Sequence, residues 1–164
     1  MVVESVRVHM LSSQHVVILK EVGRDRYLPI WIGPWEANAI AMKLQDLTPE
    51  RPLTHDLFAT TIERLGATIR QVVVSDLADE TYRARLLLDF DGREVDIDAR
   101  PSDAIALAVR AGVTIYATEA VLDRGGVIPE ESEDDKLAVF RDFVNSLDAD
   151  PGSSEGGEEP RRPD

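Results

Sequence analysis

A β-hairpin signal in the middle of the chain constrains the fold more than any other feature of the sequence. Apolar and polar residues alternate over 81–90 and again over 93–99, and Asp91-Gly92 stands between the two runs. This dipeptide is typical of two-residue β-turns, because both central positions of such a turn need positive φ angles. The predicted hairpin places Arg85 directly opposite Asp98 on the neighbouring strand.

The other predicted elements place strands on both sides of this hairpin, with helices between them. Runs rich in β-branched residues predict the strands, and apolar residues at helical spacing predict the helices. The expected strands are 2–10, 15–21, 26–32, 67–75 and 113–117, and the expected helices are 34–44, 55–65 and 101–111, with a short helical turn at 119–124. Since this order lacks regular strand–helix alternation, the predicted class is α+β, with a mixed, mostly antiparallel sheet and three packed helices.

The sequence also predicts how two of these helices are built. Thr54 is the expected N-cap of the second helix, because its hydroxyl can accept a hydrogen bond from a free backbone N–H group. This helix should turn one apolar face inwards, made of Leu57, Phe58, Ile62 and Leu65. The third helix contains AIALAV, which is apolar on nearly all sides, so we expect it to be buried.

Length and composition bound the class of protein. The 164 residues are enough for one core of ordinary size, and the absence of Cys excludes disulfides and Cys-based zinc sites. No apolar run approaches the roughly 18 residues of a membrane span, and with no secretory signal the expected location is the cytoplasm. We expect one domain over 1–128, an acidic C-terminal helix over 129–147 and a disordered acidic tail over 148–164.

The formal net charge of −13 is concentrated at the end of the chain. Residues 129–164 hold 12 acidic and 4 basic side chains, which is a net charge of −8. This distribution weakens any expectation of broad phosphate-backbone binding, which requires clustered Lys and Arg. A small site that uses carboxylates to bind a divalent cation is still compatible with it.

Three carboxylates near the end of the hairpin form the first candidate site. Asp96 and Asp98 alternate onto one face of a strand, and Asp103 follows in the first turn of the third helix. Such a cluster could hold a divalent cation beside Arg100 and support metal-assisted hydrolysis of phosphodiesters. The structural alternative is that Arg85 and Asp98 form an ordinary cross-strand ion pair and Asp103 favours the helix dipole.

The second candidate is the segment RPLTHDL at 51–57, which reaches the start of the second helix. Helix N-termini attract anions, His55 could act as a general base or metal ligand, and Asp56 could be a metal ligand. The structural alternative is that Thr54 caps the helix and Asp56 favours its dipole.

The third candidate is LPIWIGPWEA at 28–37, where Glu36 lies in the first helical turn beside two tryptophans. Trp31 and Trp35 could stack on nucleic-acid bases. The structural alternative places them in the core or in a subunit interface.

Taken together, these segments resemble the bifunctional nuclease family. The matching stretches are LPIWIGPWEANAIA, RPLTHDL and IDARPSDAIALAVR, in the same order and spacing, and the resemblance covers about 2–128. The resemblance implies a compact α+β domain that tends to self-associate and that acts on both RNA and DNA. Some members carry an extra C-terminal helical segment, and residues 129–147 occupy its place here.

The resemblance supplies no catalytic set. The expected site therefore consists of polar motif residues whose side chains are able to catalyse the reaction, bind the substrate or hold a metal ion. We expect catalytic roles for His55, Asp98, Asp103 and Arg100, and substrate-binding roles for Arg51, Ser102 and Trp35. The expected ligands of Mg²⁺ or Mn²⁺ are Asp56, Asp96, Asp98 and Asp103, and Glu36 is a further candidate. The metal would activate water for attack on a phosphodiester, and Arg100 would steady the phosphate.

Three functions remain open at this point. The first is a metal-dependent nuclease with RNA or DNA as substrate, forming a homo-oligomer for which a dimer is expected, with no membrane association. The second is a non-catalytic, homo-oligomeric interaction or regulatory domain in which the same motifs are structural. The third is a small-molecule enzyme that uses His55 as a base.

Overall fold

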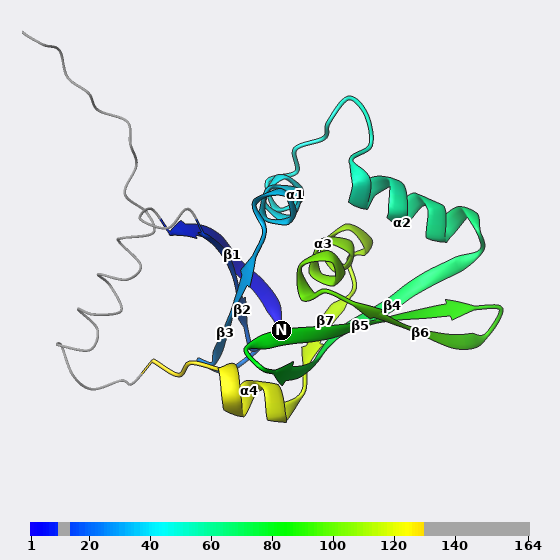
Figure 1. Cartoon of the computed structure of the whole chain (residues 1–164). Coiled ribbons are helices and arrows are strands. Elements are labelled where there is room, and N and C mark those ends of the chain that lie inside the picture. Colours follow the sequence, from blue (N-terminus) through cyan, green and yellow to red (C-terminus); the bar gives the residue numbers. More distant parts are fainter. Residues whose placement is uncertain (10–13, 130–164) are drawn as a thin grey trace, which may run out of the picture.

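The computed structural model describes residues 1–9 and 14–129 (Figure 1). The expected acidic helix and tail lie outside the described residues, apart from Pro129. No helix in the described ranges is both long enough and apolar enough to cross a membrane.

The strands form two sheets, and four helices accompany them. The first sheet is antiparallel and consists of β1 (Val2–His9), β2 (Gln14–Lys20) and β3 (Tyr27–Ile32). The second sheet has the order β6-β5-β4-β7 and consists of β4 (Ala67–Ala78), β5 (Thr81–Phe90), β6 (Arg93–Ala99) and β7 (Thr114–Ala117). The helices are α1 (Pro34–Leu44), α2 (Thr54–Arg64), α3 (Pro101–Ala111) and α4 (Glu119–Gly125).

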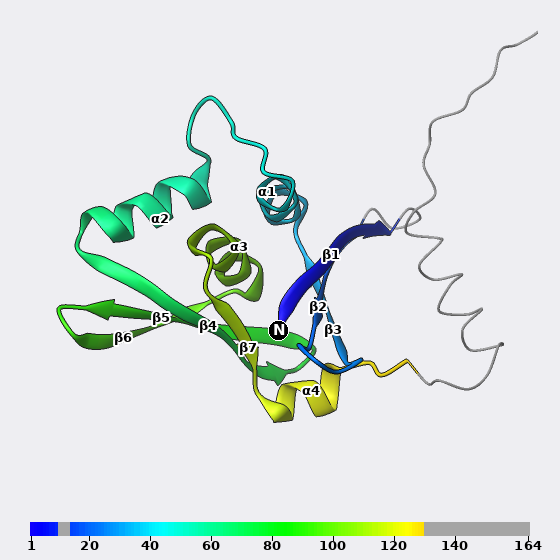
Figure 2. The same cartoon turned by 180° about the vertical axis from the view of Figure 1, so that it is seen from behind.

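This arrangement confirms the α+β class, with the strands divided between two sheets. Within the second sheet β7 pairs parallel with β4, whereas the other pairs are antiparallel (Figure 2). The predicted hairpin is β5 and β6. Its register places Arg85 opposite Asp98, as predicted, and Asp91 and Gly92 take positive φ angles of 51° and 72° in the turn.

A nearby cation relieves one unfavourable feature of this hairpin. Asp89 lies opposite Glu94, and two like charges across a strand pair repel one another. Arg70 on β4 donates to Asp89 Oδ2 over 2.6 Å, and the backbone N–H of Gly92 donates to Asp89 Oδ1 over 3.1 Å. These contacts lower the pKa of Asp89, first through the Arg70 hydrogen bond.

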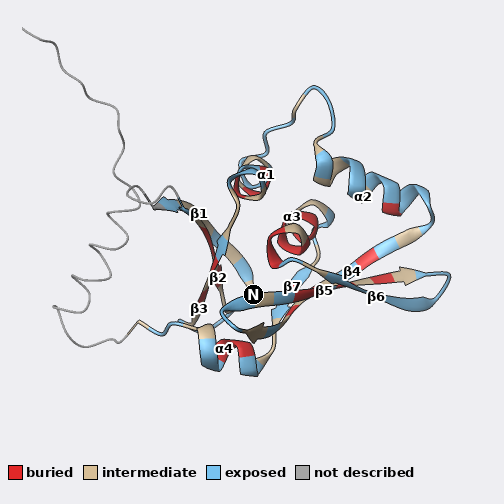
Figure 3. Ribbon diagram, viewed as in Figure 1, coloured by how far each residue is buried: buried red, intermediate tan, exposed pale blue. Residues whose placement is uncertain are grey.

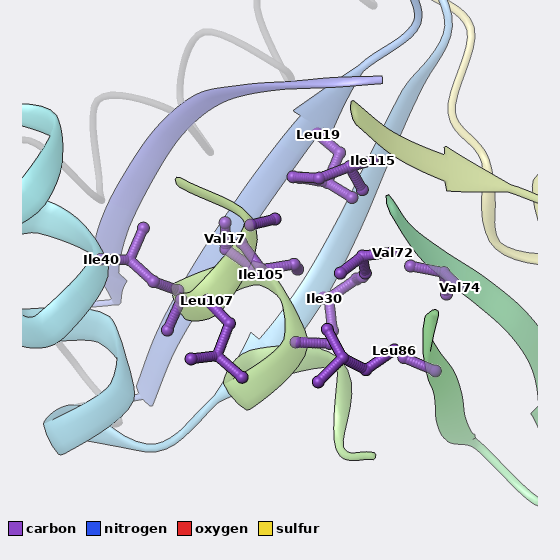
Figure 4. Close-up of a cluster of buried hydrophobic side chains, with 14 of the residues drawn as sticks. Val17, Leu19, Ile30, Ile40, Val72, Val74, Leu86, Ile105, Leu107 and Ile115 are labelled. Atoms are coloured by element: carbon purple, nitrogen blue, oxygen red, sulfur yellow. The ribbon is translucent and has the colours of Figure 1, made fainter. Parts of the chain in front are cut away.

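Helix α3 lies at the centre of the core, as its apolar sequence predicts (Figure 3). It packs against α1 and α2 on one side and against β4 and β5 on the other. Ile105 and Leu107 join Val17 from the first sheet and Val72 and Leu86 from the second in one apolar cluster (Figure 4). Because α3 is packed on both sides, its first turn is a rigid support for polar residues.

Helix α2 departs from its prediction in two ways. Ile62 is buried, but Leu57, Phe58 and Leu65 are 60%, 46% and 71% exposed, because α2 meets the core along only one narrow edge. The N-cap is Leu53 rather than Thr54. Asp56 takes over the capping role, since its carboxylate accepts from the Leu53 N–H over 2.9 Å.

Candidate active site

Four polar side chains from three helix starts form a continuous hydrogen-bonded row. Glu36 lies in the first turn of α1, Arg100 directly precedes α3, Asp103 lies in the first turn of α3, and His55 lies in the first turn of α2. Arg100 Nη2 donates to Glu36 Oε1 over 2.7 Å, and Arg100 Nε donates to Asp103 Oδ2 over 2.7 Å. His55 Nε2 lies 3.0 Å from Asp103 Oδ1.

Local sequence explains why these helix starts can meet. Pro34 and Pro101 occupy the first positions of α1 and α3, where a missing N–H costs nothing. Gly33, the N-cap of α1, lets the Glu36 carboxylate fold back over the helix start, because a Cβ at position 33 would collide with Glu36 Oε2. The absence of a side chain at Gly33 therefore makes room for the partner of Arg100.

Arg100 is held at two points and is still open to solvent. Its side chain is 67% exposed, and Nη1 has no hydrogen-bond partner within the described part of the chain. The hydrogen bonds to Asp103 and then to Glu36 raise the pKa of Arg100, so it is a permanent cation. A fixed guanidinium with free N–H donors is suited to bind a phosphate oxygen.

His55 and Asp103 form an oriented pair. Burial acts to raise the pKa of Asp103, but the hydrogen bonds from Arg100 and His55 outweigh it and hold that pKa below its usual value. Asp103 is therefore an ionised carboxylate that can only accept, and His55 Nε2 must be the donor. In this tautomer Nδ1 carries the lone pair that a base needs, and this atom has no hydrogen-bond partner among residues 1–9 and 14–129.

A groove of about 530 Å³ opens beside this pair, between α2 and the β5–β6 hairpin. Its walls are largely apolar and include Leu57 and Phe58 from α2, Ile97 from β6 and Leu107 from α3. Polar residues in its lining include Thr54, His55, Arg100 and Asp103. Asp98 also borders the groove, but it alternates with Ile97 along β6, so its side chain lies on the other face of the strand with Arg85 and Asp96. The groove therefore combines an apolar slot with one charged end.

Two further hollows adjoin Arg100. One of about 570 Å³ is lined by Trp35, Glu36, His55 and Asp103 as well as Arg100, and Trp35 is among the most exposed apolar residues described. The other, of about 430 Å³, is lined by Trp31 and Ser102, although Ser102 is almost fully buried. Arg100 is thus shared by all three hollows, whereas Arg51 lies in the exposed loop before α2 and lines none of them.

Asp56 points away from the row of four and joins the three helices instead. Its Oδ1 accepts from Arg110 Nε over 2.6 Å, and Arg110 also donates to the carbonyl groups of Ala106 and Ala39. The Arg110 side chain is only 7% exposed. Burial acts to raise the pKa of Asp56, but the hydrogen bonds from Arg110 and the Leu53 N–H lower it overall. The Asp56–Arg110 ion pair is therefore a structural contact between helices.

Arg85 pairs with Asp96, and the expected Arg85–Asp98 ion pair is not formed. Arg85 Nε and Nη2 donate to the two Asp96 oxygens over 2.7 and 2.6 Å, which lowers the pKa of Asp96. The hairpin register is as predicted, but the long Arg85 side chain reaches the diagonal neighbour on the same face. The Asp98 carboxylate is left without a hydrogen bond or ion pair in the part of the chain that the structure describes.

These pairings determine how the carboxylates fit the expected Mg²⁺ or Mn²⁺. Asp56, Asp96 and Asp103 are each bound to an arginine, and Asp98 alone is unpaired among the four. Within residues 1–9 and 14–129, no three His, Asp or Glu side chains are placed to hold one metal ion. The residues present therefore do not fit a preformed metal centre.

Comparison with known proteins places this geometry in a family. The bifunctional nuclease domain, as a family, matches residues 17–130, which is most of the described chain. The chain belongs to the bifunctional nuclease domain family. The row Glu36–Arg100–Asp103–His55 lies entirely within the matched range of this domain.

Individual relatives support the same assignment. The chain is 43% identical over 157 residues to an uncharacterised protein of Mycobacterium tuberculosis, covering 90% of this chain and 94% of that one. It is 28% identical over 120 residues to Bifunctional nuclease 1 of Oryza sativa subsp. japonica and to Bifunctional nuclease 1 of Arabidopsis thaliana. Those matches cover 71% of this chain but only 36% and 37% of the plant proteins, so the chain spans little more than a third of their length.

Sequence reasoning missed three contributors to this bifunctional nuclease domain. Gly33 makes room for Glu36, Arg110 joins the helices, and Phe58 faces a groove rather than the core. A signal for Arg110 existed, because a lone cation at the end of an apolar helix needs an acidic partner. Phe58 gave no such signal, since periodicity marks an apolar face without showing whether it is covered.

Proposed function

We propose that the chain is a nuclease that hydrolyses phosphodiester bonds of RNA, DNA or both at the row Glu36–Arg100–Asp103–His55. Membership of the bifunctional nuclease domain family and the names of the plant relatives support this reaction class. The observation that carries it is the oriented His55–Asp103 pair beside Arg100, whose outer nitrogen Nη1 is open to solvent. A base and a fixed cation are what attack on a phosphodiester requires.

The mechanism assigns one role to each group. His55 Nδ1 takes a proton from a water molecule while the water oxygen attacks phosphorus. Arg100 Nη1 donates to the non-bridging oxygens, whose negative charge develops in the transition state. The bond to the leaving oxygen then breaks, and that oxygen takes a proton from solvent. Asp103 holds the imidazole in the productive tautomer, and Glu36 and Asp103 together fix Arg100.

No step of this mechanism passes through a metal ion, because the carboxylates do not fit a preformed site. Dependence on Mg²⁺ or Mn²⁺ is nevertheless a separate proposal that can be tested directly. Among the four expected metal ligands, only Asp98 has no ion pair within the described residues. A requirement for Mg²⁺ or Mn²⁺ would therefore depend most on Asp98.

The decisive experiment is cleavage of end-labelled RNA and of single- and double-stranded DNA, each with Mg²⁺, with Mn²⁺ and with chelator. The wild type is compared with His55→Gln and with a control, Glu63→Gln, which introduces the same residue at an exposed position of α2. We expect Glu63→Gln to cleave like the wild type and His55→Gln to lose about 10²- to 10⁴-fold in rate. Equal cleavage by all three proteins would show that the activity comes from a contaminating nuclease or from a site that does not use His55.

A second candidate function, a non-catalytic homo-oligomeric module, is favoured by one observation. Leu57 and Phe58 on α2 and Leu65 at its C-cap expose apolar surface, and such surface often marks an interface. Light scattering coupled to gel filtration tests this candidate. A stable dimer that Leu65→Ser converts to a monomer, together with no cleavage of any substrate, would favour it over the nuclease.

A further inference from the structure

We propose that Trp35 is the stacking platform for a nucleobase next to the phosphate to be cleaved, at the mouth of the hollow between the starts of α1 and α2. This inference rests on the proposed nuclease function and adds its substrate class, a strand with an unpaired base beside the bond to be cleaved. Trp35 holds the base, and the row Glu36–Arg100–Asp103–His55 receives the phosphate.

Trp35 exposes a larger fraction of its surface than any other large apolar residue described. It is 82% exposed, whereas Ala37 and Ile40 on the same helix are buried in the core. These buried residues fix α1, so the indole is carried by a rigid element. Leaving so large an apolar ring in water is unfavourable, and a flat ligand that covers it recovers that free energy.

The helical repeat of α1 determines the direction of the indole. Residues four apart share one face of a helix, so Trp35 lies on the face of Ala39. Ala39 is buried, and its carbonyl oxygen accepts from Arg110 of α3 over 3.1 Å. Trp35 is one turn nearer the helix start, and helical side chains tilt towards that end. The indole therefore lies on the side of α1 that meets α3, beyond the packed part of this contact.

A hollow of about 570 Å³ connects the indole to the catalytic row. Its lining includes Trp35 from α1, Pro52 from the loop before α2, and His55, Arg100 and Asp103. This volume is in the usual range for small-ligand sites and is large enough for one nucleotide. Glu36, the residue after Trp35, binds Arg100 directly. A nucleotide whose base stacks on Trp35 therefore has its phosphate in the hollow that Arg100 and His55 line.

Stacking on an exposed indole selects the state of a base rather than its identity. Every nucleobase has an aromatic face, so such platforms tolerate all sequences. Inside a duplex both faces of a base are covered by its neighbours, and proteins that stack on bases therefore take unpaired ones. The inferred substrate is single-stranded RNA or DNA without a strong sequence preference.

Tryptophan fluorescence tests this contact, because the chain holds only two tryptophans. Trp31→Phe leaves Trp35 as the sole reporter. Trp35→Phe leaves Trp31, which is 50% exposed on β3, as the matched control. Both variants are made in the His55→Gln protein and titrated with an oligothymidine in the presence of chelator, so that the strand is not cleaved. We expect saturable quenching of Trp35 and little change in Trp31.

Affinity is measured by anisotropy with two labelled oligomers of equal length, an oligothymidine and an abasic oligomer that keeps the phosphates. We expect the abasic oligomer to bind between about fivefold and a hundredfold more weakly. Trp35→Ala should weaken oligothymidine binding to a similar extent and leave abasic binding unchanged. Leu65→Ala, which removes a 71% exposed side chain that lines none of the three hollows, should bind both oligomers like its parent.

Unchanged emission of Trp35, equal quenching of both tryptophans, or equal affinity for the two oligomers would overturn the inference. Emission of Trp35 that shifts on dilution of the protein but not on addition of oligothymidine would mean that a second copy covers the indole, and would also overturn it. Quenching of Trp35 in a protein whose wild type cleaves nothing would support the platform and overturn only the nuclease. Cleavage by the wild type without quenching would do the reverse.

Discussion

Arg100 and Glu36 are 64 residues apart in the chain, and an ion pair of 2.7 Å between Nη2 and Oε1 joins them. Since Nε of the same guanidinium is bound to Asp103, two carboxylates on different helices set its orientation. The guanidinium is therefore positioned before any substrate arrives. Donors that need no reorganisation at the moment of reaction contribute most to transition-state stabilisation.

Arg100→Lys should lower kcat/KM for phosphodiester cleavage by about 10²-fold, although the charge is kept. A lysine ammonium cannot bind Glu36 and Asp103 and also present a planar pair of donors to phosphate. Steady-state cleavage kinetics measure this loss. Arg70→Lys is the matched control, because Arg70 is 63% exposed and forms a comparable 2.6 Å ion pair with Asp89 away from the site. Loss of activity in both variants would mean that the effect is not specific to Arg100.

Gly33→Ala should reduce activity by about tenfold with a stability change within about 0.5 kcal/mol. The new Cβ displaces only the end of the flexible Glu36 side chain, and the φ of −72° at Gly33 suits alanine. Glu36 would then release Arg100. Cleavage rates and thermal unfolding report the two effects.

Gly112→Ala provides the opposite pattern as a control. Gly112 has a φ of 66° and nothing within 4 Å of an added Cβ, so alanine meets strain but no clash. This variant should lose about 1 kcal/mol of stability and keep full activity. Full activity in Gly33→Ala would contradict the role assigned to Glu36.

Asp56→Asn should lower the free energy of unfolding by about 2 kcal/mol, because the buried Arg110 guanidinium loses its charged partner. Urea denaturation measures this change. The double variant Asp56→Asn/Arg110→Met should recover part of the loss, since no unpaired charge is then left inside. Additive losses in the double variant would show that the two side chains do not depend on one another.

Asp103 should make the protein lose stability in acid. Its pKa is lowered in the folded state, so its contribution is fully present above the unfolded value of about 3.9 and is lost as pH falls through the folded value. The difference in melting temperature between wild type and Asp103→Asn should therefore shrink as pH drops from about 6 to below 4. A difference that stays constant over this range would exclude the charged pairing of Asp103 as its source.

Backbone features were the most predictable part of this molecule. Alternation and the Asp91-Gly92 turn predicted the β5–β6 register, and the apolar sequence of α3 predicted its burial. Both follow from local rules: strand side chains repeat every two residues, and a helix that is apolar all round must be enclosed. The grouping of strands into two sheets depends on pairings between distant segments, which local patterns do not encode.

Side-chain partners were less predictable, as Arg85 demonstrates. The backbone position of Arg85 opposite Asp98 is as predicted, but its side chain binds Asp96. Strand register alone does not determine which of the two carboxylates the side chain reaches. The site shows the same limit. His55, Arg100 and Asp103 were named from motifs and lie together, whereas the partners of Asp56 and Asp96 became visible only in three dimensions.

The parallel pairing of β4 with β7 determines when the site can form during folding. Residues 71–74 pair with 114–117, and β5, β6 and α3 all lie in the connection between them. Closing a long connection loses chain entropy before its contacts are gained, so such pairings are slow compared with a hairpin. Arg100 and Asp103 lie inside that connection. A nascent chain that has not yet reached Thr114 can already make the β5–β6 hairpin, but it lacks the parallel partner of β4 that completes the second sheet, so we expect cleavage activity to appear late in folding.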